Sequence, residues 1–95
     1  MLNQRIRILR QARGLSQVEL ARILGVTKQS VSNWENDNIQ PSIDMLKRIA
    51  QTFGVSADYL LGLDDSEYID VRGLPQDVVA HLRQLVEDFR TAYKF

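Results

Sequence analysis

Apolar positions recur at helical spacing through the first 62 residues, and short clusters of polar residues, glycine and proline interrupt them. Leu2, Ile6 and Leu9 lie on one face of a helix expected over residues 2–13, which Gly14 ends as a C-cap. Four more helices are expected over residues 17–24, 28–36, 43–53 and 57–61. Five short helices leave little room for a cavity, so we expect them to share one core.

Serine and threonine mark where these helices begin. Ser16 and Glu19 form a capping box, because each side chain can accept a hydrogen bond from the other residue's backbone N–H. The next three helices follow the N-cap residues Thr27, Ser42 and Ser56. The pattern therefore predicts an all-α domain over residues 1–63.

The chain changes character after Leu63. Residues 64–67 form an acidic linker, and residues 68–71 show the alternation and β-branching of a short extended segment. Gly73-Leu74-Pro75 then introduces a last helix, expected over residues 76–94, with proline in its first turn. Residues 64–95 are thus expected to comprise a linker, a short extended segment and a C-terminal amphipathic helix.

Residues 16–36 read SQVELARILGVTKQSVSNWEN and contain two short helices around a tight turn. Ala21 and Gly25 stand where the helices would cross and the chain would turn, and both positions need small residues. Val31 and Trp34 supply the buried face of the second helix. Its opposite face is then free to meet a partner.

That outer face is polar and nearly free of carboxylate. At about 100° per residue, Ser32, Gln29 and Asn33 fall within about 140° of Lys28. Gln29 and Asn33 can pair with adenine, Lys28 can reach guanine acceptors, and the short Ser32 can reach either. Taken alone, such residues more often form a solvated helix face, but their place in this two-helix motif favours reading of DNA bases.

The motif resembles the helix-turn-helix of the phage repressor and Cro family, also called the XRE family, over residues 2–62. The residues that carry the resemblance are Gly14-Leu15-Ser16-Gln17, Glu19-Leu20-Ala21, Gly25-Val26-Thr27, Ser30-Val31 and Trp34-Glu35-Asn36. Membership of this family implies a five-helix, lambda-repressor-like DNA-binding domain.

The resemblance also implies roles for individual residues. The expected base readers are Lys28, Gln29, Ser32 and Asn33. The expected phosphate contacts are Gln17, Thr27 and Asn36. Arg10 and Glu35 are implied to form a structural ion pair inside the domain. Asp37 stands where many relatives have glycine, and its charge would mildly repel phosphate.

Charge is divided unequally along the chain. The whole sequence has 12 basic and 12 acidic residues and a formal charge of zero. Residues 1–63, however, carry eight bases and five acids, a net charge of +3, whereas residues 64–95 carry four bases and seven acids, a net charge of −3. Only residues 1–63 carry a net positive charge that favours binding to a polyanion. Among them, Arg5, Arg7 and Arg13 are expected to provide long-range attraction.

Several functional classes are disfavoured. The sequence has no cysteine and one histidine, His81, so disulfides, thiol nucleophiles and zinc sites rich in sulfur or imidazole are excluded. The carboxylates Glu19, Glu35, Asp44 and Asp58 fall on separate helices, without a phosphate-binding loop, so we expect no enzyme. No apolar run approaches a membrane span, and we expect a cytoplasmic protein without metal, cofactor or small-molecule ligand.

The last helix carries an apolar stripe that must be covered. Its expected dimer-interface residues are Val78, Leu82, Leu85, Val86, Phe89 and Tyr93. Either the five-helix domain in cis or the same helix of a second chain can cover them, and the alternating spacing of three and four favours a two-helix seam. In a dimer, residues 68–71 could also pair as edge strands.

The sequence therefore predicts a bacterial or phage transcriptional repressor that binds a palindromic operator as a homodimer. Two recognition helices about 34 Å apart would combine two modest half-site affinities. The alternative is an antitoxin or adaptor module whose C-terminal apolar helix binds a partner protein, with DNA binding serving autoregulation.

Overall fold

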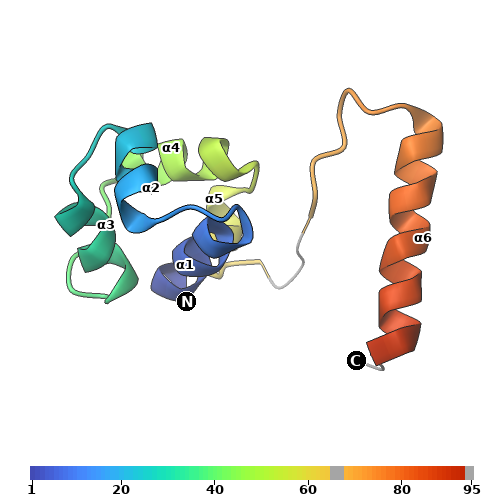
Figure 1. Cartoon of the computed structure of the whole chain (residues 1–95), viewed down its shortest axis with the longest axis horizontal. Helices are drawn as coiled ribbons and strands as arrows, with labels where there is room; N and C mark the ends of the chain where they lie inside the picture. The colour runs from blue at the N-terminus through green and yellow to red at the C-terminus, as the bar shows by residue number, and fades with distance from the viewer. Residues whose placement is uncertain (65–67, 94–95) are drawn as a thin grey trace.

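The computed structural model describes residues 1–64 and 68–93, and all regular elements in these ranges are helices (Figure 1). The helices are α1 (Leu2–Ala12), α2 (Gln17–Leu24), α3 (Lys28–Glu35), α4 (Ile43–Phe53), α5 (Ala57–Leu61) and α6 (Gln76–Tyr93). The first five pack into one body, and α6 lies apart from it. The all-α fold with a separate C-terminal helix is therefore confirmed.

The helices begin where the polar residues predict. In α2, Ser16 Oγ accepts a hydrogen bond from the backbone N–H of Glu19, whose side chain accepts one from the N–H of Ser16. Thr27, Ser42 and Ser56 cap α3, α4 and α5 in the same way, each bonding the N–H three residues further on. These bonds satisfy backbone donors that have no partner inside the helix.

Two helix ends differ slightly from the expectation. Arg13, not Gly14, is the C-cap of α1, and Gly14 follows it with a φ of +69°. Asn36 is the C-cap of α3, so that helix ends one residue early. At the α2–α3 turn, Gly25 has a φ of +71°, a left-handed conformation that favours glycine.

One core holds the five helices together. Each helix contributes at least one fully buried residue: Ile6, Leu20, Leu24, Val31, Ile49 and Leu60. Ala21 and Trp34 are also buried, as expected where α2 meets α3. Because α3 packs against both α1 and α2 with its apolar side, the opposite side is held facing outward.

The segment between the body and α6 contains no strand in its described part. Residues 68–70 have no regular structure, and the linker residues 65–67 lie outside the described residues. A strand needs a second extended segment for its hydrogen bonds, and the described residues contain no strand with which this segment pairs. Pairing of residues 68–71 across a dimer therefore stays a prediction.

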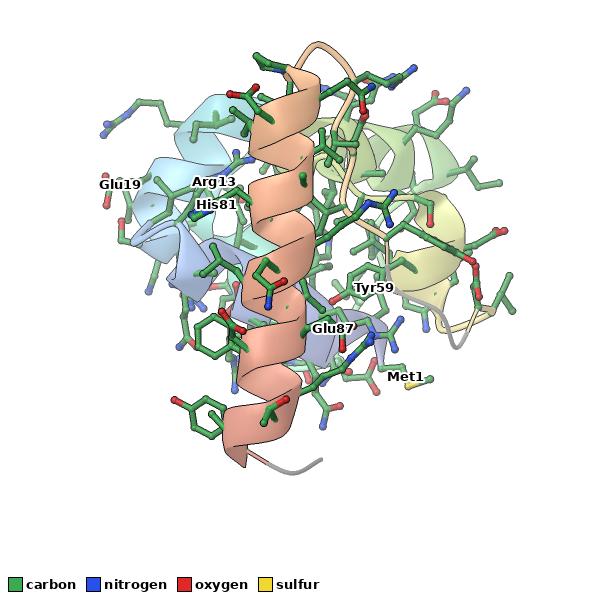
Figure 2. The ribbon with its side chains drawn as sticks, turned by 90° about the vertical axis from the view of Figure 1, so that its right-hand side faces the viewer. Met1, Arg13, Glu19, Tyr59, His81 and Glu87 are labelled. Carbon is green, nitrogen blue, oxygen red and sulfur yellow. The ribbon has the colours of Figure 1, made fainter. Side chains whose placement is uncertain are left out.

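No residue of α6 is buried. In Figure 2, His81 and Glu87 mark different flanks of the helix, which stands in front of the body. The apolar stripe ends in Phe89 and Tyr93, which are 56% and 63% exposed, with their rings stacked at 5.9 Å. None of the described helices is long and apolar enough to span a membrane.

Candidate nucleic-acid interface

The outward side of α3 presents the expected polar side chains. Lys28 and Gln29 are exposed, and Ser32 and Asn33 are half-buried one turn further along. Val31 and Trp34 are buried on the opposite side. The helix is thus divided into a core face and a hydrogen-bonding face, as the spacing predicts.

Two of these polar residues are joined to each other. Gln29 Nε2 donates a hydrogen bond to Asn33 Oδ1 at 3.0 Å. The two residues are four apart on one helix, which brings their side chains together. The sequence places them on one face, but the bond also requires a particular side-chain conformation.

Ser32 belongs to a second chain of hydrogen bonds. Asn36 Nδ2 donates to Ser32 Oγ at 3.2 Å, and Arg7 Nη2 donates to Asn36 Oδ1 at 3.4 Å. Arg7 Nη2 also reaches the Glu35 carbonyl oxygen at 3.3 Å. This network connects α1 to the end of α3.

Glu35 is the buried polar centre of the body, with only 2% of its surface exposed. Arg10 Nε lies 2.7 Å from Glu35 Oε2, and Arg10 Nη2 lies 2.9 Å from Oε1. Arg10 Nη1 also donates to the Leu15 carbonyl oxygen at 2.8 Å. The guanidinium thus ties α1 to α3 and to the loop before α2.

Gln17, the first residue of α2, also forms a hydrogen bond with the Glu35 carboxylate. Its Nε2 donates to Glu35 Oε1 at 3.2 Å, and Arg7 Nε lies 3.4 Å from the same oxygen. Burial raises the pKa of the Glu35 carboxyl, but hydrogen bonds from Arg10, Gln17 and Arg7 outweigh it, so the pKa lies below the ordinary value. The hydrogen bond to Glu35 raises the pKa of Arg10. Both groups therefore stay charged at neutral pH.

Thr27 is exposed at the start of α3, where its hydroxyl accepts from the Ser30 backbone N–H at 3.1 Å. Its Oγ1 is also 3.0 Å from Ser30 Oγ. The N-terminus of a helix favours anions, because its backbone N–H groups are unpaired and the helix dipole is positive there. Thr27 therefore lies where a phosphate would be favoured.

Arg5 and Arg7 of α1 and its C-cap Arg13 have packing roles that were not predicted from the sequence. Arg5 stacks over the Tyr59 ring at 4.3 Å and donates to the Tyr59 carbonyl oxygen. Arg13 stacks over the Phe53 ring at 4.9 Å. Arg7 bonds Glu35 and Asn36, and its position three residues before Arg10 on one helix face was the available signal. These contacts are structural, and the long-range attraction expected of these arginines stays a prediction.

The described residues contain no group of three or more histidine, cysteine, aspartate or glutamate side chains that could hold a metal ion. His81 is exposed on α6, well removed in sequence from the α3 surface. The chemistry of the α3 surface is therefore that of neutral hydrogen-bonding groups with one lysine, and it suits recognition of base edges. Fold and surface together define a helix-turn-helix DNA-binding domain.

Comparison with known proteins identifies the family. Residues 6–60 match the helix-turn-helix family. The chain is 40% identical over 65 residues to the HTH-type transcriptional regulator YobD of Bacillus subtilis, a match that covers 68% of this chain and 58% of YobD. It is 36% identical over 64 residues to the antitoxin PezA of Streptococcus pneumoniae, covering 67% of this chain and 40% of PezA. The chain thus spans about half the length of these curated relatives.

Two solved structures share the fold. The P22 c2 repressor in complex with a synthetic operator superimposes with a TM-score of 0.63 and 30% identity, covering 67% of this chain and 97% of the repressor chain. The SinR protein/SinI protein complex gives a TM-score of 0.62 and 28% identity, covering 99% of this chain and 92% of the other. The chain belongs to the helix-turn-helix family, of the phage repressor and Cro (XRE) type.

Proposed function

We propose that this protein is a transcriptional repressor of the bacterial cytoplasm that binds a palindromic operator as a homodimer. The observation that carries the proposal is the outer face of α3, where an unburied row of neutral hydrogen-bonding residues stands opposite a buried apolar row. Such a helix can enter the major groove without bringing carboxylates to the phosphates. The P22 c2 repressor, which shares the fold, is described in complex with an operator.

Within this proposal, the base-reading and phosphate-binding residues have separate tasks. Lys28, Gln29, Ser32 and Asn33 would contact base edges, and Gln17, Thr27 and Asn36 would contact phosphates. Gln17 gives one amide N–H to buried Glu35, which leaves a second N–H for a phosphate oxygen. Asn36 is held by Arg7 and Ser32. Both phosphate contacts are therefore anchored to the body and would set its orientation on DNA.

Residues 64–95 would serve assembly and stay clear of DNA. The exposed stripe of α6 continues into the segment before it, because Tyr68, Ile69 and Val71 line an open apolar hollow together with Val79, Leu82 and Val86. A second copy that covers the stripe would remove this surface from water. The net charge of −3 on these residues would keep them away from phosphate.

A second candidate function is that of an antitoxin or adaptor whose α6 binds another protein. It is favoured by the exposed stripe, by the likeness to the antitoxin PezA, and by the SinR/SinI complex, whose match extends over α6. The state of the purified chain distinguishes the two. A stable dimer occupies the stripe and supports the repressor, whereas a monomer that aggregates until a second protein is added supports the adaptor.

Selection of bound duplexes from a random DNA library tests the repressor proposal, because it returns half-site sequence, spacing and symmetry together. Gln29→Ala or Asn33→Ala should lose about 1 to 3 kcal/mol on the selected operator and relax base preference. Gln17→Ala should weaken binding to all sequences alike. Equal losses on operator and random DNA for the two α3 variants would refute the assignment of base readers.

A further inference from the structure

We propose that Gln29 and Asn33 read DNA as one hydrogen-bonded pair, in which Asn33 holds the Gln29 amide against an adenine and itself donates to the neighbouring base pair. The inference rests on the proposed function and specifies how that site selects its sequence. It starts from the 3.0 Å bond between Gln29 Nε2 and Asn33 Oδ1.

The bond fixes the orientation of the Gln29 side chain. Gln29 is exposed and has three rotatable bonds, so a free side chain would sample many conformations. Asn33 is shorter and half-buried, and its backbone carbonyl accepts hydrogen bonds from the N–H groups of Asn38 and Ile39. The better-held residue thus orders the mobile one before DNA arrives, which lowers the entropic cost of binding.

The remaining hydrogen-bonding groups of Gln29 match adenine. Its amide has two N–H donors and one oxygen, and Asn33 takes one of the donors. When Asn33 takes the N–H that lies trans to Oε1, the other N–H and Oε1 stand side by side as a donor and an acceptor. In the major groove, adenine offers N7 as an acceptor beside the N6 amino group as a donor. Gln29 therefore keeps its complete bidentate contact while bonded to Asn33.

The hydrogen-bonding groups that remain on the Asn33 side chain favour bases other than adenine. Its Oδ1 already accepts from Gln29, so the two N–H groups of Nδ2 are what it offers to a neighbouring base. Guanine presents N7 and O6 as acceptors, and thymine presents O4. The pair as a whole is thus complementary to an adenine next to a guanine or a thymine, whereas two independent amides would both favour adenine.

Ser32 lies on the same helix but in the other network, and it provides a matched control. Its hydroxyl accepts from Asn36, which is held by Arg7. In the described part of the chain, no side-chain hydrogen bond joins this network to Gln29 or Asn33. Effects of Ser32→Ala and Gln29→Ala should therefore multiply, as effects at independent sites do.

A double-mutant cycle on the full-length chain and its selected operator tests the pair. Q29A and N33A should each weaken binding about tenfold, and Q29A/N33A should be no more than about threefold weaker than the weaker single variant. N33A should also relax base preference at the adenine read by Gln29. Replacing that adenine by 7-deazaadenine, which lacks N7, should weaken the wild type and leave Q29A unchanged. In contrast, Q29A/S32A should show the product of the single losses.

The outcomes separate this inference from the proposed function. A roughly hundredfold loss in Q29A/N33A, with N33A relaxing only its own base, would overturn the pair and leave operator binding intact. Failure of the wild type to select any sequence would overturn both. In the free protein, N33A should shift the side-chain amide resonances of Gln29 and not those of Gln17. Unchanged Gln29 resonances would also overturn the pair.

Discussion

Arg10 and Glu35 form a two-pronged ion pair, at 2.7 and 2.9 Å, between the first helix and the last residue of α3. The Glu35 carboxylate also accepts hydrogen bonds from Gln17, at the start of α2, and from Arg7 of α1. One buried carboxylate thus connects α1, α2 and α3, and the last two of these helices carry the proposed DNA contacts. A change at Glu35 is therefore expected to alter both stability and DNA binding.

The first prediction concerns the ion pair itself. Glu35→Ala should destabilise the chain by about 3 to 5 kcal/mol, because it leaves the Arg10 guanidinium poorly solvated and without its partner. The double variant Arg10→Met/Glu35→Leu should recover most of that loss, since it removes both charges. Urea unfolding measures these changes. The exposed pair Asp70–Arg72 is the control, and Asp70→Ala should shift the urea midpoint far less than Glu35→Ala does. Equal losses in E35A and D70A would contradict the structural role of Glu35.

The second prediction is a loss of stability in acid. The pKa of folded Glu35 lies below its ordinary value of 4.5, so the folded chain holds this proton less tightly than the unfolded chain. Glu35 therefore makes its full contribution to the free energy of unfolding at a pH above its pKa in the unfolded chain. This contribution is lost as the pH falls through the lower pKa that Glu35 has in the folded chain. Urea midpoints measured from pH 6 down to pH 2.5 should fall most steeply below about pH 4.5.

Matched variants identify the carboxyl group that is responsible for the loss of stability in acid. Glu35→Gln should flatten the fall of the urea midpoint. Arg72 lowers the pKa of Asp70 to about 2, but this pair is exposed and local in sequence, so Asp70→Asn should leave most of the fall in place. An unchanged slope in E35Q would show that another carboxylate is responsible.

The third prediction concerns the backbone after α3. Asp37 has a φ of +58° and is the only non-glycine residue with positive φ in the described part of the chain. Its N–H bonds the Trp34 carbonyl while the N–H of Asn38 bonds the Asn33 carbonyl, the arrangement that usually places glycine here. Asp37→Gly should stabilise the chain by about 0.5 to 1 kcal/mol.

The same substitution should raise affinity for DNA, because it removes a negative charge next to Asn36, a proposed phosphate contact. Asn38→Gly is the control, since this residue has no positive φ and glycine there should destabilise. Thermal unfolding and binding to the selected operator measure the two effects. A less stable D37G variant would contradict the strain assigned to Asp37.

The fourth prediction tests assembly through α6. Phe89 is 56% exposed in the single chain, so Phe89→Glu should leave the chain folded and weaken self-association at least about tenfold. Sedimentation at micromolar concentrations measures the association, and circular dichroism checks the helices. Gln84, on the polar side of α6, bonds Asp88, and Gln84→Ala should have little effect on the dimer. A wild-type chain that is monomeric at tens of micromolar would refute the dimer.

The helix-turn-helix could be predicted from the sequence because its signals are local. Ser16 and Glu19 lie within one turn of each other, so their capping box does not depend on the rest of the fold. Periodicity likewise separates Val31 from Gln29 without knowledge of the neighbouring helices. These signals predicted the ends of α2, α4 and α5 and the outward face of α3.

Contacts between distant residues were decided by the tertiary structure. Gln17 and Glu35 are 18 residues apart, and Arg7 and Asn36 are 29 apart, so their hydrogen bonds depend on how α1, α2 and α3 pack. The stacking of Arg5 on Tyr59 likewise joins the first and the last helix of the five-helix body, which are far apart in sequence. The spacing of α6 predicted an apolar stripe, but only the fold leaves that stripe exposed. Local backbone chemistry acts over a few residues, whereas these contacts form only when the shared core brings separate helices together.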